Sequence, residues 1–370
     1  MTAPDDFEAW FRLLETPGLG RAGARRLLAA CGSPEGVFGT AAAALRQIVG
    51  PEAAAALARQ PPLFDDRLDA AKRWLAGARA AVRRVLTLDL PAYPRQLLET
   101  ADPPLLLYVE GEAACLGEPS IAIVGSRHAT AQGLDNARAF AAELSRQGLV
   151  VVSGLALGID AAAHEGALGG RAGTVAVLGT GLDPVYPARH QALARRIAGH
   201  GALVSEFAPG TPPLREHFPL RNRIIAGLAR GTLVVEAAPQ SGSLITARQA
   251  AEAGREVFAI PGSIHSPQSR GCHALIKQGA KLVESAADIL DELPGPARPR
   301  SRTPAAATPT PPEQSDPLLA ALGHDPTTLD ALQARTGWST AELGARLLEL
   351  ELEGRVARLP GGLYQRRGTA

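Results

Sequence analysis

Glycine- and serine-containing turns with nearby arginines are the groups in this 370-residue sequence that are best suited to bind an anion. Glycine lets the backbone approach a ligand, N–H groups at a helix start attract anions, and the guanidinium fork matches phosphate oxygens. These groups therefore predict a phosphate-binding site. The candidate residues, including one aromatic ring, are Gly125, Ser126, Arg127, Arg215, Phe218, Arg221, Asn222, Arg223, Ser241, Gly242 and Ser243.

Two common nucleotide-binding fingerprints are absent. Gly125 is followed by SRHATAQG, and Gly179 with Gly181 has no third glycine in place, so neither turn is a GxGxxG dinucleotide motif. The triphosphate loop GxxxxGK[ST] is missing as well. Arginines beside Phe218 suit a single nucleic-acid strand, since guanidinium groups bind phosphates and an aromatic ring stacks on a base.

The cationic cluster also has a structural interpretation, which the sequence leaves open. Phe218 is followed by Pro219, and its ring could pack into the core. The arginines of the cluster, Arg221 and Arg223, could instead pair with Glu206 or Glu236.

Catalysis has weaker support. Asp160 and His164 share a helix face, as an acid–base pair would, but helix capping by Asp160 and packing of His164 are the favoured interpretation. No His, Cys and Asp residues have the spacing of a metal site. We therefore expect no catalytic residue, no metal and no cofactor.

Alternating strands and helices are expected to position the candidate turns. The apolar runs IAIVG (121–125), LVVVSG (149–154), TVAVLG (174–179), ALVSEF (202–207), TLVVEA (232–237) and EVFAIPG (256–262) alternate with amphipathic helical segments. This pattern predicts an α/β fold with a doubly wound, Rossmann-like parallel sheet. Ligands of such sheets bind at the carboxyl ends of the strands, where the candidate turns fall.

The chain divides into four expected parts. Residues 1–85 have helical spacing and a Pro-Gly-Leu-Gly turn that resembles a helix-hairpin-helix, as in a small SAM-like helical domain, and residues 86–293 contain the sheet. Residues 294–315 form a Pro-rich linker. Residues 316–370 show three helices and a hairpin, the pattern of a winged helix, and its acidic second and third helices favour a protein partner over duplex DNA.

Overall composition narrows the function classes. Lys+Arg 38 against Asp+Glu 37 gives a net charge of +1, so a nucleic-acid site must be a local cluster of positive charge. No apolar run approaches the ~20 residues of a membrane span. The start MTAPDDFEAW lacks the basic region of a secretory signal. We expect a cytoplasmic protein that does not cross a membrane.

The segments IAIVGSR, VVVSGLALGIDAAAHEGAL, VAVLGTGLDPVYP, HFPLRNRIIAGL and SGSLITARQAAEAGREVFAIPGS together resemble the DNA-processing protein A family (DprA, also called Smf) over about residues 85–293. The resemblance implies a non-enzymatic dimer that binds and protects single-stranded DNA during natural transformation and loads the RecA recombinase. It also implies DNA contacts at Arg127, Arg215 and Phe218, and dimerisation through the segment around Cys272–Leu282.

Two departures from the family pattern leave a question open. Ala188, with Arg189 beside it, stands where many relatives carry a lysine, and Arg215 replaces a common lysine. The sequence does not decide whether Arg189 restores a phosphate contact that Ala188 lacks.

Two other functions also remain open. One is a phosphoribohydrolase-like enzyme acting on nucleotide monophosphates, although its PGGxGT signature is replaced by Pro261-Gly262-Ser263. The other is a scaffold that recruits the recombinase through the winged helix.

Overall fold

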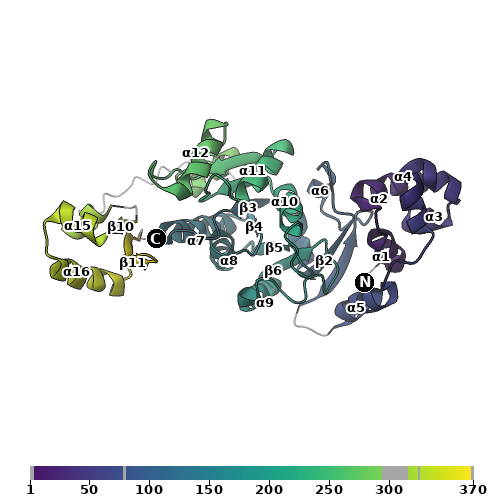
Figure 1. Ribbon diagram of the computed structural model, residues 1–370, viewed down its shortest axis with the longest axis horizontal. Coiled ribbons are helices and arrows are strands. Elements are labelled where there is room, and N and C mark those ends of the chain that lie inside the picture. The colour runs from purple at the N-terminus through teal and green to yellow at the C-terminus, as the bar shows by residue number, and fades with distance from the viewer. Residues whose placement is uncertain (1–3, 78–80, 294–315, 324–325, 368–370) are drawn as a thin grey trace.

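A nine-stranded sheet forms the centre of the protein, and the computed structural model describes residues 4–77, 81–293, 316–323 and 326–367 (Figure 1). In spatial order its strands are β1 (Arg83–Thr87), β2 (Leu106–Gly111), β6 (Gly201–Ser205), β5 (Thr174–Leu178), β4 (Val150–Ser153), β3 (Ser120–Val124), β7 (Gly231–Val234), β8 (Glu256–Ala259) and β9 (Lys281–Leu282). The strands from β6 to β9 are parallel, whereas β2 is antiparallel to both β6 and β1. The predicted doubly wound parallel sheet is confirmed, with an antiparallel edge added.

Helices cover both faces of the sheet, because its strands are apolar on both sides. One face carries α7 (Ala131–Arg146), α8 (Ile159–Ala167), α9 (Gln191–His200) and α13 (Ala286–Glu292). The other carries α6 (Arg95–Leu98), α10 (His217–Leu228), α11 (Ser243–Glu252) and α12 (Arg270–Lys277). Three short 3-10 turns, η1 (Ala113–Gly117), η2 (Ala188–His190) and η3 (Pro267–Ser269), lie in the connections.

The strand order reverses beside β3. The chain runs from β3 through β4 and β5 to β6 on one side, and then crosses back to place β7 on the other side of β3. The turns after β3 and β7 therefore meet, and the Ser126 N–H donates to the Glu236 carbonyl at 2.8 Å. Ligands of open α/β sheets bind at such a reversal.

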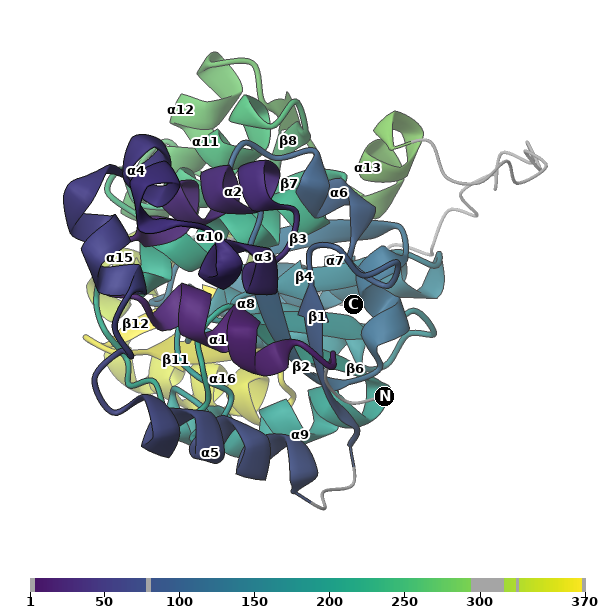
Figure 2. The same cartoon turned by 90° about the vertical axis from the view of Figure 1, so that its right-hand side faces the viewer.

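The N-terminal helices share a core with the sheet. They are α1 (Phe7–Glu15), α2 (Gly20–Cys31), α3 (Pro34–Gly39), α4 (Ala42–Leu57) and α5 (Phe64–Ala76). The rings of Phe7 and Trp74 lie 6.5 Å and 5.9 Å from that of Tyr108 on β2. Figure 2 shows α1 and α5 lying across the edge formed by β1 and β2. The predicted domain limit at residue 85 falls within β1, a strand of this sheet.

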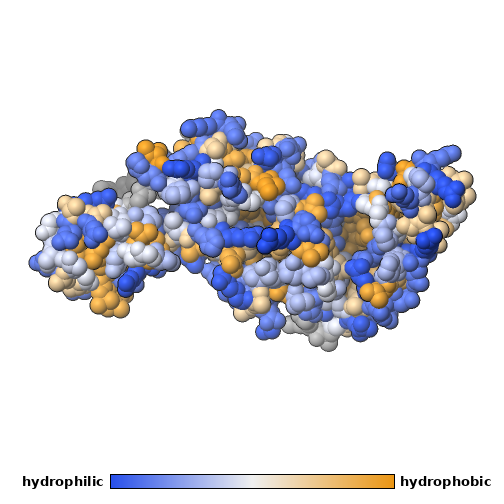
Figure 3. All heavy atoms as spheres, in the orientation of Figure 1, coloured by the Kyte–Doolittle hydropathy of each residue, from blue (hydrophilic) through white to orange (hydrophobic). Residues whose placement is uncertain are grey.

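The C-terminal part is a winged helix, as predicted. It comprises α14 (Pro317–Leu322), β10 (Thr327–Thr328), α15 (Leu329–Thr336), α16 (Thr340–Leu352), β11 (Val356–Leu359) and β12 (Leu363–Arg366), with β12 between β10 and β11. Its core is mainly leucine, while Leu348 and Leu352 on α16 are exposed, in keeping with the apolar patches on this part in Figure 3. The predicted linker, residues 294–315, lies outside the described residues.

The winged helix contacts the sheet domain at the start of α7. The Arg367 guanidinium pairs with the Asp135 carboxylate at 2.9 Å, and the Gln132 N–H donates to the Gln365 side-chain oxygen at 3.4 Å. Asp135 also pairs with Arg138 at 3.1 Å. Within the described residues, no helix has the length and apolar character needed to cross a membrane.

His164 on α8 is wholly buried. Its Nδ1 lies 2.7 Å from Thr174 Oγ1, whose hydroxyl donates to the Val151 carbonyl. Burial lowers the pKa of His164 from 6.5 to about 3, and His190 and Arg221 act in the same direction. The ring is therefore neutral in the folded protein at neutral pH.

The neutral ring predicts acid sensitivity. Below about pH 6.5 the unfolded chain binds a proton at His164 that the folded chain does not, so the free energy of unfolding falls as the pH falls, by at most ~1.4 kcal/mol per pH unit. Urea denaturation should show that His164→Gln loses less stability than the wild type between about pH 7.5 and about pH 5. His265→Gln, which removes an exposed histidine, should keep the wild-type dependence. Equal losses in all three proteins would contradict this assignment.

Candidate nucleic-acid interface

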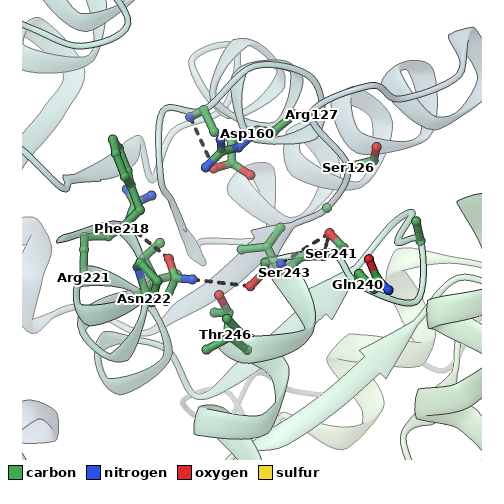
Figure 4. A pocket seen from close by; sticks show the side chains of 18 of the residues that line it. Ser126, Arg127, Asp160, Phe218, Arg221, Asn222, Gln240, Ser241, Ser243 and Thr246 are labelled. Atoms are coloured by element: carbon green, nitrogen blue, oxygen red, sulfur yellow. Dashed lines mark hydrogen bonds between the residues drawn. The ribbon is translucent and has the colours of Figure 1, made fainter. Parts of the chain in front are cut away.

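An open pocket of about 790 Å³ lies where the turns after β3 and β7 meet the start of α10 and α11 (Figure 4). Ten of the eleven candidate residues line it. They are Gly125, Ser126, Arg127, Arg215, Phe218, Arg221, Asn222, Ser241, Gly242 and Ser243. Residues that are far apart in the sequence are thus brought to one site, as the parallel sheet predicts.

The turn after β3 presents Arg127 to the pocket. Ser126 is buried, and its hydroxyl accepts the N–H of His128 at 3.0 Å, whereas Arg127 is exposed. Gly158 packs beneath this turn with a φ of +77°, and a Cβ there would lie 2.2 Å from the Ser126 carbonyl oxygen. Only glycine fits this position, so Gly158 determines how closely α8 supports Arg127.

An aromatic pair stands on the opposite wall. The Phe218 ring, on the first turn of α10, is half-buried, and its centroid lies 5.8 Å from that of Tyr186. The guanidinium carbon of Arg127 lies 5.7 Å from the Phe218 centroid. Phe218 therefore neither packs fully into the core nor stands free. Tyr186 is 46% exposed and lines the same pocket. Tyr186 was not among the predicted residues, although its aromatic ring, in the VYP segment after β5, could have been recognised as a candidate for stacking.

Arg221 has a structural role. Its side chain is 4% exposed and donates to the carbonyls of Gly154, at 2.7 Å, and of Val177. The Asp160 carboxylate accepts the N–H groups of Gly154 and Ala156 at 3.1 and 3.3 Å. Burial lowers the pKa of Arg221 to about 10, with Asp160 opposing the shift, so Arg221 stays charged at neutral pH. Arg221 therefore joins the carboxyl ends of β4 and β5.

Arg223 requires a correction, because it does not line the pocket. Its guanidinium binds the Glu206 carboxylate at 2.5 Å and donates to the Asp102 carbonyl at 2.7 Å. Arg223 also pairs with the Asp102 carboxylate at 3.0 Å, and Arg21 and Arg25 of α2 bind this carboxylate as well. The pairing of Arg223 with Glu206, one of the two interpretations left open by the sequence, is the one in the structure. Arg223 ties α10 to the N-terminal helices.

The turn between β7 and α11 places the N-terminus of α11 at the wall of the pocket. The Ser241 and Ser243 hydroxyls lie 2.7 Å apart, and the Asn222 amide donates to the Gly242 carbonyl at 3.4 Å. The first turn of α11 has no acidic residue and no side-chain cap. Three arginines line the pocket against a single carboxylate, that of Asp160. The pocket is electropositive, and its helix start suits a phosphate.

The residues considered for catalysis are engaged elsewhere. Asp160 lines the pocket, but its carboxylate is held by backbone N–H groups, and His164 packs against Thr174 beneath it. Among the described residues, no group of three His, Cys, Asp or Glu side chains could hold a metal ion.

Comparison with known proteins gives two family matches. Residues 84–294 match the family described as DNA recombination-mediator protein A, and residues 302–362 match the DprA winged helix domain. Among curated proteins, the chain is 45% identical over 289 residues to Protein Smf of Escherichia coli K12, covering 76% of this chain and 77% of the relative. It is 50% identical over 201 residues to DNA processing protein DprA of Streptococcus pneumoniae, covering 54% and 71%.

Two solved structures are similar. The X-ray structure of DprA from Streptococcus pneumoniae superposes with a TM-score of 0.68 at 38% identity, covering 80% of this chain and 100% of that one. The structure of DNA processing protein A from Helicobacter pylori, described by its single-stranded DNA binding mode, gives a TM-score of 0.52 at 30% identity, covering 56% and 94%.

The burial of Arg221 predicts a stability effect that separates it from the exposed Arg127. Arg221→Ala removes two hydrogen bonds to carbonyls and the cation beside buried Asp160, so the free energy of unfolding should fall by ~3–5 kcal/mol. Arg127→Ala should change stability by less than ~0.5 kcal/mol, because the side chain is exposed. Urea denaturation of both variants tests this difference. If the two were equally stable, Arg221 would not join β4 and β5 in this way.

Proposed function

This chain belongs to the DNA recombination-mediator protein A (DprA) family, and we propose that it binds single-stranded DNA in the pocket between the turns after β3 and β7. The observation that carries the proposal is the exposed Arg127 guanidinium beside the half-buried Phe218 ring, in a pocket with one carboxylate. The Helicobacter pylori relative, by its description, binds single-stranded DNA.

The residues suggest how a strand would bind. Phosphate oxygens would accept from Arg127 and Arg215, with the positive end of the α11 dipole beside them, while a base stacks on Phe218. A ring inside a pocket is accessible to an unpaired base but not to a base stacked within a duplex. The site therefore favours single strands and is tolerant of sequence, since every base has a face that can stack.

We further propose the cellular role that family membership implies. The bound strand would be protected and passed to the RecA recombinase during natural transformation, in the cytoplasm. The family description, which names mediation of recombination, supports this role. The proposed activity is binding rather than catalysis, because Asp160 is held by the backbone and His164 is buried.

A homodimer through the edge of the sheet near β9 is the proposed assembly. Leu282 on this edge strand is 45% exposed, and within the part of the chain that the structure describes β9 pairs on one side only, with β8. The proposal concerns the exposed residues of the segment rather than Cys272 itself, which is wholly buried with its sulfur near the Val234 carbonyl.

Binding should depend on phosphate contacts and on stacking. Arg127→Ala and Arg215→Ala should each weaken binding of single-stranded oligonucleotides of any sequence and reduce the salt slope by about 0.7. Phe218→Ala should cost ~1–3 kcal/mol if a base stacks on the ring. Fluorescence anisotropy with single- and double-stranded oligonucleotides over a salt series measures all three effects.

The matched control is Arg46→Ala, which removes an exposed arginine on α4. It should leave the affinity near the wild-type value. Wild-type affinity in both Arg127→Ala and Arg215→Ala would rule out this pocket. Release of free base from nucleoside monophosphates would instead support the phosphoribohydrolase-like alternative.

The dimer proposal has a separate test. Leu282→Asp should shift the protein toward the monomer in sedimentation velocity, because a charge would be buried in the interface. Leu352→Asp places the same charge on the exposed face of α16 and should leave the assembly unchanged. An unchanged assembly in Leu282→Asp would exclude β9 from the interface.

A further inference from the structure

Helix α16 of the winged helix has two apolar sides, and the fold covers only one of them. The inner side packs into the leucine core through Leu343, Leu347 and Leu350, which are all buried. At ~100° per residue, the opposite side carries five residues without polar side chains, all of them exposed. We call this set the outer stripe, and its members are Ala341, Gly344, Ala345, Leu348 and Leu352.

No described part of the chain covers the outer stripe. Leu348 is 57% exposed and Leu352 is 81% exposed. The winged helix meets the sheet domain through Gln365 and Arg367, at the end of β12, and Figure 1 shows α16 at the end of the molecule opposite the N-terminal helices. Two leucines one helical turn apart are therefore left in water, where they gain nothing from the fold.

Gly344 has no packing role within the protein. A Cβ at this position would meet no atom within 4 Å, so the core does not require a glycine there. Glycine is also less favourable than alanine inside a regular helix. A glycine flanked by Ala341 and Ala345 does, however, allow another backbone to come close to α16. The N-terminal half of the outer stripe is thus shaped to receive a second helix.

Carboxylates lie on both flanks of the outer stripe. By the same helical geometry, one flank carries three glutamates and the other carries one, and these are Glu342, Glu349, Glu353 and Glu351. The one guanidinium of α16, that of Arg346, is engaged by Asp316 and Glu349. In winged helices that read duplex DNA, the corresponding helix enters the major groove. An acidic and apolar α16 would be repelled by the phosphates, so its surface suits a cationic and apolar partner.

A second copy of this chain does not have that chemistry. Two α16 helices placed stripe to stripe would bring their carboxylates together. The arginine-containing helices α2 and α9 already bury their apolar sides, with Leu27 and Ile197 wholly enclosed. Among the exposed large apolar side chains of the described residues, only Leu348 and Leu352 lie one turn apart on the same helix. The partner must therefore come from another protein.

We propose that the outer stripe of α16 is a docking surface for a helix of another protein, one whose apolar stripe is flanked by lysine or arginine. The partner's apolar residues would cover Leu348 and Leu352, its backbone would approach α16 at Gly344, and its cations would face the glutamates. The inference does not depend on the DNA-binding pocket, so either proposal can fail without the other.

The test is the binding of a designed helix to the full-length protein. The probe is a fluorescent amphipathic peptide of leucine and lysine, compared by anisotropy with the same peptide carrying glutamate in place of lysine. The lysine peptide should bind, more weakly as salt is added, and the glutamate peptide should not bind. Leu348→Ser and Leu352→Ser should each weaken binding about tenfold, because each removes a leucine that the peptide would bury. Leu98→Ser, which removes an exposed leucine on α6, should bind like the wild type.

Gly344→Gln separates docking from stability. It places a better helix former inside α16, so the urea concentration at the midpoint of unfolding should stay the same or rise. Its side chain would nevertheless occupy the space that the partner helix needs, so peptide binding should weaken as in Leu352→Ser.

Four outcomes would overturn the proposal. Equal binding of the two peptides would remove the role of the glutamates, and wild-type binding in all three α16 variants would place the peptide elsewhere. If Leu348→Ser lowered the affinity for duplex DNA, the outer stripe would be a nucleic-acid surface. If Leu348→Ser shifted the protein toward the monomer in sedimentation velocity, the outer stripe would be a contact between copies of this chain.

Discussion

The candidate site depends on a guanidinium that is shielded from solvent. Arg221 reaches from α10 under the rim of the sheet and donates to the Gly154 and Val177 carbonyls, with Asp160 nearby to offset its charge. A Cβ on Gly154 would lie 2.6 Å from this guanidinium, so only glycine at position 154 leaves room for the Arg221 side chain. This contact fixes α10 against β4 and β5, and α10 in turn carries Phe218 into the pocket.

The reversal of strand order supplies the second constraint. Because β7 returns to lie beside β3, the Ser126-Arg127 turn and the Ser241-Gly242-Ser243 turn share one rim although a large part of the chain separates them. The short turns after the strands then need only small residues and cations to form an anion site. The site is unusual in its balance of charges, because exposed arginines line the pocket and almost no acidic side chain lies beside them.

Features that depend on periodicity were predictable from the sequence, whereas features that depend on a distant partner were not. The apolar runs predicted the parallel strands, and ten of the eleven candidate residues between these runs line one pocket. The sequence left the pairing of Arg223 with Glu206 open and did not indicate Asp102, whose carboxylate lies 3.0 Å from the Arg223 guanidinium although it is 121 residues away along the chain. Tyr186 lies after β5, and only the folded loop brings its ring to Phe218. The sequence also left open whether Arg189 replaces a phosphate contact that Ala188 lacks. In the structure, Arg189 and Arg127 line one cavity.

The aromatic core shared by the N-terminal helices and β2 has a consequence for the integrity of the molecule. The family match begins at residue 84, yet Arg83 depends on the Trp74 carbonyl and on Glu110, and Tyr108 packs against the rings of Phe7 and Trp74. The N-terminal helices α1 to α5 thus cover the antiparallel edge of the sheet and share a core with it. A fragment beginning at residue 84 would lack Arg83, so it would expose the ring of Tyr108 and leave Glu110 without its ion-pair partner, together with an uncovered strand edge that favours aggregation.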